Sequence, residues 1–252
     1  MNAAPFAIDE ALLAAATARL RANLNLRFVM GGAGTGKSSV CHHLHALMRL
    51  PVIDMDARMY GAWGDRWDPA RHPANSAWMR AADPLAWQLS LAPEAFLQFH
   101  AAATAEALDL LAEEMAEMAA AAEADEGVTV LIDGGFGSLA VVARAVPPAS
   151  IVCLAMPPRS STFVWTSDPG RRGFLEEVAA VATVADPVAR FLALDAALSE
   201  RMVADAGHTG TAIVTRSPET PLEVTAVLVA AAFGLHPADP AGRPGGRQGA
   251  RA

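Results

Sequence analysis

The sequence predicts an α/β fold in which helices cover both faces of a five-stranded parallel sheet. Five apolar segments of four or five residues alternate with longer segments of helical periodicity. These short segments are mostly apolar, as expected of strands that are buried on both faces of a parallel sheet. The chain has 252 residues, of which 53% are hydrophobic and 18% are charged, so it can bury a large core.

The first elements are a helix, a strand, a second helix and a second strand. Residues 8–22 repeat apolar side chains at helical spacing, with acids first and arginines last, the order that the helix dipole favours. Residues 26–30 form a short apolar segment typical of a strand. A glycine-rich turn then leads into a predicted helix over 37–49, and 51–54 is the second strand.

The middle of the chain contains an irregular region and the longest helix. Residues 58–92 are rich in Trp, Pro, Arg and Asp and show weak periodicity, so we expect short helices in irregular chain. Pro93 suits the first turn of a helix, and the Ala, Leu, Glu and Met residues of 94–124 continue it. The apolar segments 128–132 and 151–154 are predicted to be buried strands.

The last third of the sequence is predicted to form helical segments, a strand, a further helix and a tail. Residues 174–205 have helical periodicity, with a break expected near Asp186-Pro187. A strand is predicted over 211–214 and a helix over 221–233. The Gly-, Pro- and Arg-rich residues 237–252 are predicted to be disordered, which leaves 1–236 as a single domain.

Charge and cysteine content disfavour several classes of protein. Lys and Arg total 19 and Asp and Glu total 27, giving a net charge of −8 that argues against nucleic acid or an anionic membrane as partner. Cys41 and Cys153 are too few for a disulfide framework. The N-terminal stretch lacks the basic region of a secretory signal, and no apolar run reaches about 18 residues. We therefore expect a soluble cytoplasmic protein, with a homodimer left open.

A phosphate-binding motif follows the first predicted strand. Residues 31–38 read Gly-Gly-Ala-Gly-Thr-Gly-Lys-Ser, which matches G-x-x-x-x-G-K-[S/T] between a strand and a helix. Lys37 is the only lysine in the chain. The segment resembles the Walker A loop of P-loop NTPases. The resemblance implies ATP and Mg²⁺ as ligands, with Ser38 on the metal. The implied nucleotide-binding residues are Gly32, Ala33, Gly34, Thr35, Gly36, Lys37, Ser38 and Ser39.

Two carboxylates follow the second predicted strand. If the strand continues, alternation places Asp54 and Asp56 on the same side, where one could support Mg²⁺ and the other could deprotonate an acceptor hydroxyl. An ordinary acidic turn is the alternative. At this position Asp-x-Asp resembles the small-molecule P-loop kinases, such as shikimate and gluconate kinase. The resemblance implies that Asp56 and Arg58 contact the acceptor.

An acid and two glycines follow the third predicted strand. Asp133 after an apolar strand resembles a Walker B element that supports Mg²⁺, and Gly134 and Gly135 could present backbone N–H groups to the acceptor. Shikimate kinase has no acid in this glycine run, so Asp133 fits a nucleoside-kinase-like member of the family better. A tight turn after a buried strand is the alternative.

Two further loops resemble parts of these kinases. Residues 157–175 correspond to an arginine-bearing lid, for which Arg171, Arg172 and Arg159 are the candidates in that order. An ordinary basic loop is the alternative. The segment 215–221 resembles their adenine-side loop, although it also reads as a plain helix cap.

Together these motifs predict a P-loop small-molecule kinase. It would move the γ-phosphoryl group of ATP-Mg to a hydroxyl of a small molecule, with a helical acceptor-side insertion at 58–124. Lys37, Asp54, Asp56, Arg171 and Arg172 would be catalytic, and Ser38, Asp54 and Asp133 would hold the metal. Which of the three acids is the base stays open. The alternative function is a switch protein that binds and hydrolyses ATP and acts through a protein partner.

Overall fold

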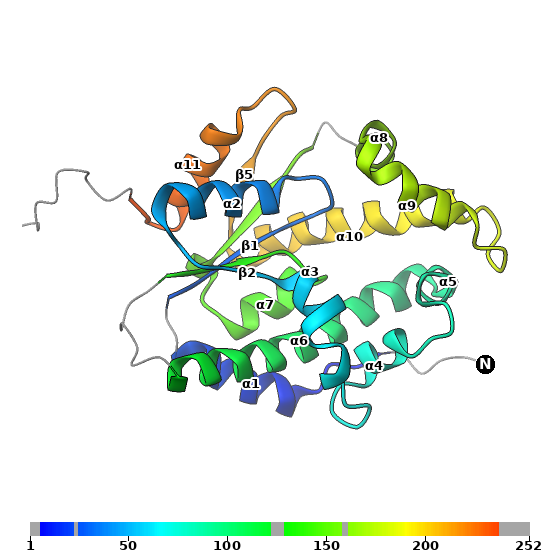
Figure 1. The fold of residues 1–252 in the computed structure, drawn as a ribbon, viewed down its shortest axis with the longest axis horizontal. Coiled ribbons are helices and arrows are strands. Elements are labelled where there is room, and N and C mark those ends of the chain that lie inside the picture. Colours follow the sequence, from blue (N-terminus) through cyan, green and yellow to red (C-terminus); the bar gives the residue numbers. More distant parts are fainter. Residues whose placement is uncertain (1–5, 23–24, 122–128, 158–160, 237–252) are drawn as a thin grey trace, which may run out of the picture.

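A five-stranded parallel sheet forms the centre of the protein (Figure 1). The structure is a computed structural model that describes residues 6–22, 25–121, 129–157 and 161–236. The strands are β1 Leu26–Gly31, β2 Val52–Asp54, β3 Val130–Asp133, β4 Ile151–Ala155 and β5 Ala212–Thr215. They are arranged in the order β2-β3-β1-β4-β5. This α/β architecture has a P-loop-like topology and confirms the predicted fold class.

Helices connect the strands and account for most of the remaining described chain. The α-helices are α1 Glu10–Ala22, α2 Lys37–Met48, α3 Met55–Ala57, α4 Pro73–Met79, α5 Pro84–Ser90, α6 Pro93–Ala121, α7 Leu139–Ala145, α8 Ser161–Ser167, α9 Pro169–Ala179, α10 Pro187–Thr209 and α11 Leu222–Ala232. The short helices are the π-helical turn η1 Arg58–Ala62 and the 3₁₀ turns η2 Gly64–Arg66 and η3 Pro148–Ser150.

The sheet is covered on both faces, because alternate residues of each strand point to opposite sides. Phe28 and Met30 of β1 pack into one core with helices α1, α6, α7 and α10. Val29, between them, packs into a second core with α2 and α11. Figure 1 shows these two layers above and below the strands. Both cysteines are buried reduced thiols, as the sequence predicted.

The predicted break near Asp186-Pro187 is confirmed. Helix α9 ends at Ala179 and α10 begins at Pro187. The Asp186 carboxylate accepts a hydrogen bond of 3.2 Å from the backbone N–H of Ala189 and so caps the helix. Pro187 suits the first turn, because a backbone N–H at that position would have no partner within the helix. The local sequence therefore sets the start of this helix.

Three regions differ from the sequence-based expectation. Helices α7 and α8 were not predicted, since seven residues are too few for a clear helical period. The lid region predicted as a loop is formed by α8 and the start of α9. The C-terminal half of α6 belongs to the core that β1 forms with α1 and α7, a packing arrangement that the sequence did not predict. The predicted tail, 237–252, lies outside the described residues.

None of the described helices combines the length and hydrophobicity needed to cross a bilayer.

Candidate functional site

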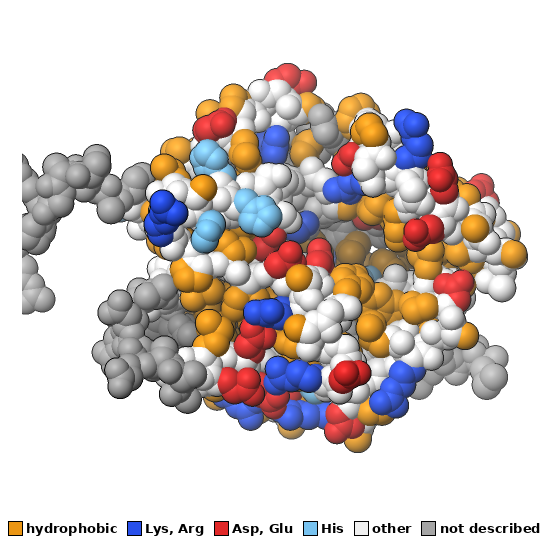
Figure 2. Space-filling view, viewed as in Figure 1, with side chains coloured by type: hydrophobic (Ala, Val, Ile, Leu, Met, Phe, Trp, Pro, Cys, Tyr) orange, Lys and Arg blue, Asp and Glu red, His pale blue; other side chains and the backbone are white. Residues whose placement is uncertain are grey.

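A cavity of about 950 Å³ lies where the carboxyl ends of the central strands meet. It is bounded by the phosphate loop, the turn after β3, helices α8 to α10 and the region around η1 and α6. Parallel α/β sheets bind their ligands at this edge, where loops from several strands converge. The hollow is visible in the space-filling view, between α8–α9 and the helices that follow β2 (Figure 2).

The glycines of residues 31–38 adopt the conformation that a phosphate loop requires. Gly31, Gly34 and Gly36 have φ values of 140°, 70° and 91°, in the region that favours glycine. A Cβ atom on Gly31 would lie 2.3 Å from the carbonyl oxygen of Leu154. Gly36 precedes the first turn of α2, so backbone N–H groups and the positive end of the helix dipole face the cavity. The loop therefore suits an anionic ligand such as a phosphate chain.

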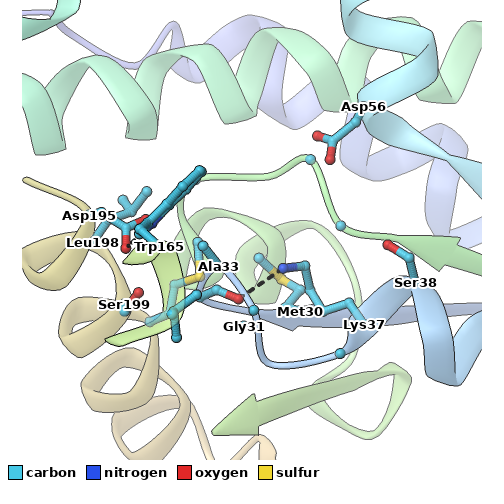
Figure 3. A pocket seen from close by; sticks show the side chains of 18 of the residues that line it. Met30, Gly31, Ala33, Lys37, Ser38, Asp56, Trp165, Asp195, Leu198 and Ser199 are labelled. Carbon is cyan, nitrogen blue, oxygen red and sulfur yellow. Dashed lines mark hydrogen bonds between the residues drawn. The ribbon is translucent and has the colours of Figure 1, made fainter. Parts of the chain in front are cut away.

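Lys37 lies in the cavity with its ammonium group against the loop. Its Nζ donates a hydrogen bond of 3.0 Å to the carbonyl oxygen of Gly32 (Figure 3). Burial lowers the pKa of Lys37, while Asp56, Asp133 and Asp195 raise it and Arg171 lowers it further. The side chain is thus a partly desolvated cation among acids, and an incoming phosphate would neutralise it.

Asp133 and Ser38 fit the predicted magnesium site. The Asp133 side chain is 3% exposed, and its Oδ1 has no hydrogen-bond partner in the described part of the chain. Burial raises its pKa, whereas hydrogen bonding from Ser38 and the charge of Lys37 lower it. No group of three His, Cys, Asp or Glu side chains among the described residues could hold a metal alone. Mg²⁺ commonly uses only one or two protein carboxylates and completes its shell with phosphate and water, so the arrangement suits it.

Replacing Asp133 with asparagine should stabilise the free protein at pH 7. Because the folded-state pKa of Asp133 is raised, its ionisation opposes folding once the pH rises through that value, and the neutral amide removes this cost. We expect Tm to rise by about 2–4 °C, the shift that about 1 kcal/mol gives in a domain of this size. The gain should shrink as the pH falls toward 3.8, the ordinary value for aspartate.

Scanning calorimetry at pH 7 and pH 4 checks this prediction. Added ATP and Mg²⁺ should stabilise the unmodified protein more than the variant. If the variant melts at a lower temperature than the unmodified protein at pH 7, the conclusion that ionised Asp133 destabilises the fold is contradicted.

The prediction that Asp54 and Asp56 lie on one side of a continuing strand is wrong. Strand β2 ends at Asp54, whose carboxylate accepts a hydrogen bond of 3.0 Å from the backbone N–H of Ala57 and caps α3. Asp54 does not line the cavity, although it pairs in register with Asp133 on the neighbouring strand. Asp56 lines the cavity, because the helical turn rotates it away from Asp54.

Asp56 points into the cavity from the side opposite the phosphate loop (Figure 3). Asp56 remains exposed to solvent, and partial desolvation by the surrounding protein raises its pKa, while the charge of Lys37 opposes this shift and the charges of Asp54 and Asp133 add to it. A carboxylate with a raised pKa beside a phosphate site can accept a proton from a hydroxyl group.

The glycines after β3 line the cavity as predicted, but Arg58 does not. Gly134 and Gly135 have φ values of 62° and 75°, and Lys37 Cε would lie 3.2 Å from a Cβ atom on Gly134. Arg58 instead donates to Glu114 on α6, with 2.9 Å between Nη2 and Oε1. Arg58 lies in the π-helical turn η1 with its side chain directed toward α6, so the structure does not place it among the residues that line the cavity.

Helices α8 and α9 lie over the phosphate loop. Val164 of α8 is so close to Gly34 that a Cβ atom there would lie 2.3 Å from its Cγ1. The Arg171 guanidinium stacks 4.7 Å from the ring centre of Trp165, and both line the cavity. Arg172 is exposed and does not line the cavity, because it lies on a different side of α9. Arg159, a further candidate, lies outside the described residues.

Sequence reasoning missed many of the residues that line the cavity, and four of them have polar or aromatic side chains beside the phosphate loop or the lid. Arg216 donates to the carbonyl oxygen of Thr35 at 3.5 Å and lies against Gly36 of the phosphate loop. Its position after the last strand was a signal, because all strand exits converge on this edge. The others, Trp165, Asp195 and Ser199, carried no motif. Trp165 donates to Asp195 at 3.0 Å, a contact between α8 and α10 that only the tertiary fold creates.

No family model matches the chain, and a search of curated proteins found no similar sequence. The fold and the cavity define the protein as an α/β protein with P-loop-like topology.

Proposed function

We propose that the protein is an ATP-dependent kinase that phosphorylates a hydroxyl group of a small molecule. One observation carries the proposal. A single cavity joins a complete phosphate loop to a carboxylate, Asp56, on its opposite wall. The cavity of about 950 Å³ leaves space beyond the phosphate loop, and Asp56 borders that space. A kinase needs both, because it must align an acceptor with that phosphate.

The residues suggest a division of roles. The backbone N–H groups of 32–36 and the Lys37 ammonium would hold the phosphate chain and stabilise the charge that develops on it. Ser38 and Asp133 would hold Mg²⁺, which when bound neutralises charge on the phosphate oxygens. Asp56 would accept the proton of the acceptor hydroxyl. The acceptor oxygen then bonds to the γ-phosphorus while the bond to the β,γ-bridging oxygen breaks, which leaves ADP.

The lid residues would keep water away from the transferring group. The charge of Arg171 lowers the pKa of Lys37, and the Arg171 guanidinium stacks on Trp165. Arg171 also pairs with Asp168 at 3.3 Å and places a positive charge in the cavity wall, where it can offset negative charge on the γ-phosphate.

Replacing Arg171 with alanine should lower kcat by about a hundredfold, the usual effect of removing one charged group from a transition state. Arg172→Ala is the matched control, because it removes the same side chain from the next position on α9, outside the cavity. It should change kcat by less than about twofold. Steady-state kinetics on the two variants tests the assignment, and equal losses would contradict it.

The direct test incubates the purified protein with ATP, Mg²⁺ and a cell metabolite extract and searches for new phosphorylated species by mass spectrometry. We expect at least one species that gains a phosphoryl group and is absent with Lys37→Ala. Conversion of ATP to ADP without such a species would favour the ATP-hydrolysing switch instead.

A further inference from the structure

A second, smaller cavity of about 40 Å³ continues from the Asp56 side of the main one. The two cavities share Tyr60, His100, Gly135 and Gly137 in their walls. The deeper walls are largely apolar and include aromatic rings from Trp78 and Phe99. A small group of a molecule whose hydroxyl lies near Asp56 could therefore reach this smaller space.

A buried amide with one unused atom lines this smaller cavity. Asn75 is 1% exposed, and its Nδ2 donates to the carbonyl oxygen of Ala103 at 3.0 Å and to Glu106 Oε2 at 2.8 Å. Both partners are acceptors, which fixes the amide orientation. Asn75 Oδ1 has no hydrogen-bond partner in the described part of the chain. Because buried polar atoms are almost always paired, we expect Oδ1 to accept a hydrogen bond from water in the free protein and from a donor group of a ligand that displaces this water.

The amide is held rigidly. Glu106 is 4% exposed, and its two oxygens also accept the backbone N–H groups of Ala74 and Asn75, each at 2.8 Å. The carboxylate thereby fixes both the backbone and the side chain at position 75. Such a network positions Oδ1 before any ligand arrives, which lowers the entropic cost of binding.

Three arginines near the acceptor side pair with acids of α6. The shortest bonds are 2.9 Å from Arg58 to Glu114, 3.1 Å from Arg66 to Glu113 and 2.7 Å from Arg71 to Asp109.

In the described part of the chain, no Lys or Arg side chain lines the smaller cavity. Among the described residues that line either cavity, the Lys and Arg side chains are Lys37, Arg171 and Arg216, which belong to the phosphate loop, the lid and the loop beside Gly36. His100 is neutral at pH 7, because burial lowers its pKa to about 4. Asp56 would repel an acidic acceptor, since no cation of the deeper walls offsets its charge.

We propose that the acceptor is a neutral or cationic alcohol with an apolar body and, away from the reacting hydroxyl, an amino or hydroxyl group that donates a hydrogen bond to Asn75 Oδ1. This inference rests on the proposed kinase function and predicts that acidic acceptors are poor substrates.

Charge fractionation of a metabolite extract tests the class of acceptor. Ion exchange separates the extract into anionic, neutral and cationic fractions, and each is incubated with the protein, Mg²⁺ and ATP labelled at the γ-phosphate. We expect Lys37-dependent transfer in the neutral or cationic fraction. Transfer confined to the anionic fraction would overturn this inference and leave the kinase function standing. Transfer in no fraction would overturn the kinase function itself, and this inference with it.

Two variants then test the role of the smaller cavity with the active fraction. Asn75→Ala should raise the acceptor KM about tenfold, the effect of losing one hydrogen bond, with the KM for ATP unchanged. Because Asn75 also holds Glu106, a second variant leaves that network intact. Ala103→Val narrows the smaller cavity and should also raise the acceptor KM. Ala102→Val is its control, since Ala102 is equally buried on α6 and lines neither cavity.

Folding of each variant is checked by its stabilisation with ADP and Mg²⁺. An unchanged acceptor KM in folded Ala103→Val, or in folded Asn75→Ala, would overturn the proposed position of the acceptor. Equal rises in acceptor KM for Ala103→Val and Ala102→Val would also overturn it.

Discussion

Lys37→Ala should lower phosphoryl transfer by about a thousandfold while the protein stays folded. The ammonium group is the cation of the phosphate loop, and removal of one preorganised charge typically costs a hundredfold to a thousandfold. Burial lowers the pKa of Lys37, so its charged form is not a source of folding stability and Tm should not fall. Transfer rates with the acceptor found in the metabolite screen, together with Tm, measure both effects.

Lys37→Arg separates charge from shape. The guanidinium is planar and larger than an ammonium group, and Lys37 Cε would lie 3.2 Å from a Cβ atom on Gly134, which leaves little room there. We expect this variant to keep less than about a tenth of the activity. Full activity in either variant would refute the role of Lys37 in charge stabilisation.

Asp56→Asn should lower kcat by a hundredfold to ten-thousandfold with little change in ATP binding, because a general base typically contributes that much. Asp54→Asn is the matched control. It changes a carboxylate two residues away that caps α3 instead of lining the cavity, and asparagine caps a helix about as well as aspartate. Its kcat should change by less than about threefold. Equal losses at the two positions would contradict the choice of Asp56 as the base.

The pH profile gives a second measurement of Asp56. Its pKa is raised above the ordinary 3.8, and only the ionised carboxylate can accept a proton. The value of kcat/KM for the unmodified protein should therefore fall as the pH is lowered through this raised pKa. Asp56→Asn should lack this acid limb. The same limb in the variant would assign the titration to another group.

The strands and the phosphate loop could be predicted because their signals are local. Each strand is a short apolar run, and the glycines of 31–36 follow one directly, so sequence order alone places the loop at the sheet edge. The predicted helix break at Asp186-Pro187 was equally local, since a capping side chain and a first-turn proline adjoin there.

The acceptor side could not be predicted because its geometry depends on backbone turns and distant partners. One helical turn after β2 separates Asp54 from Asp56, where strand alternation had placed them together. Arg58 faces Glu114, 56 residues further along, and Trp165 meets Asp195 across two helices. No residue spacing in the sequence encodes these contacts. The two neighbouring lid arginines likewise differ only in which side of α9 each occupies.

The fate of the terminal phosphate tests the central claim most directly. ATP labelled with ¹⁸O on the three non-bridging γ-oxygens is incubated with the protein, Mg²⁺ and the metabolite extract, and the products are analysed by mass spectrometry. A kinase transfers all three labelled oxygens to an organic phosphate, and Lys37→Ala should not. Recovery of the label only as inorganic phosphate, which carries three labelled oxygens and one from water, would contradict the kinase function.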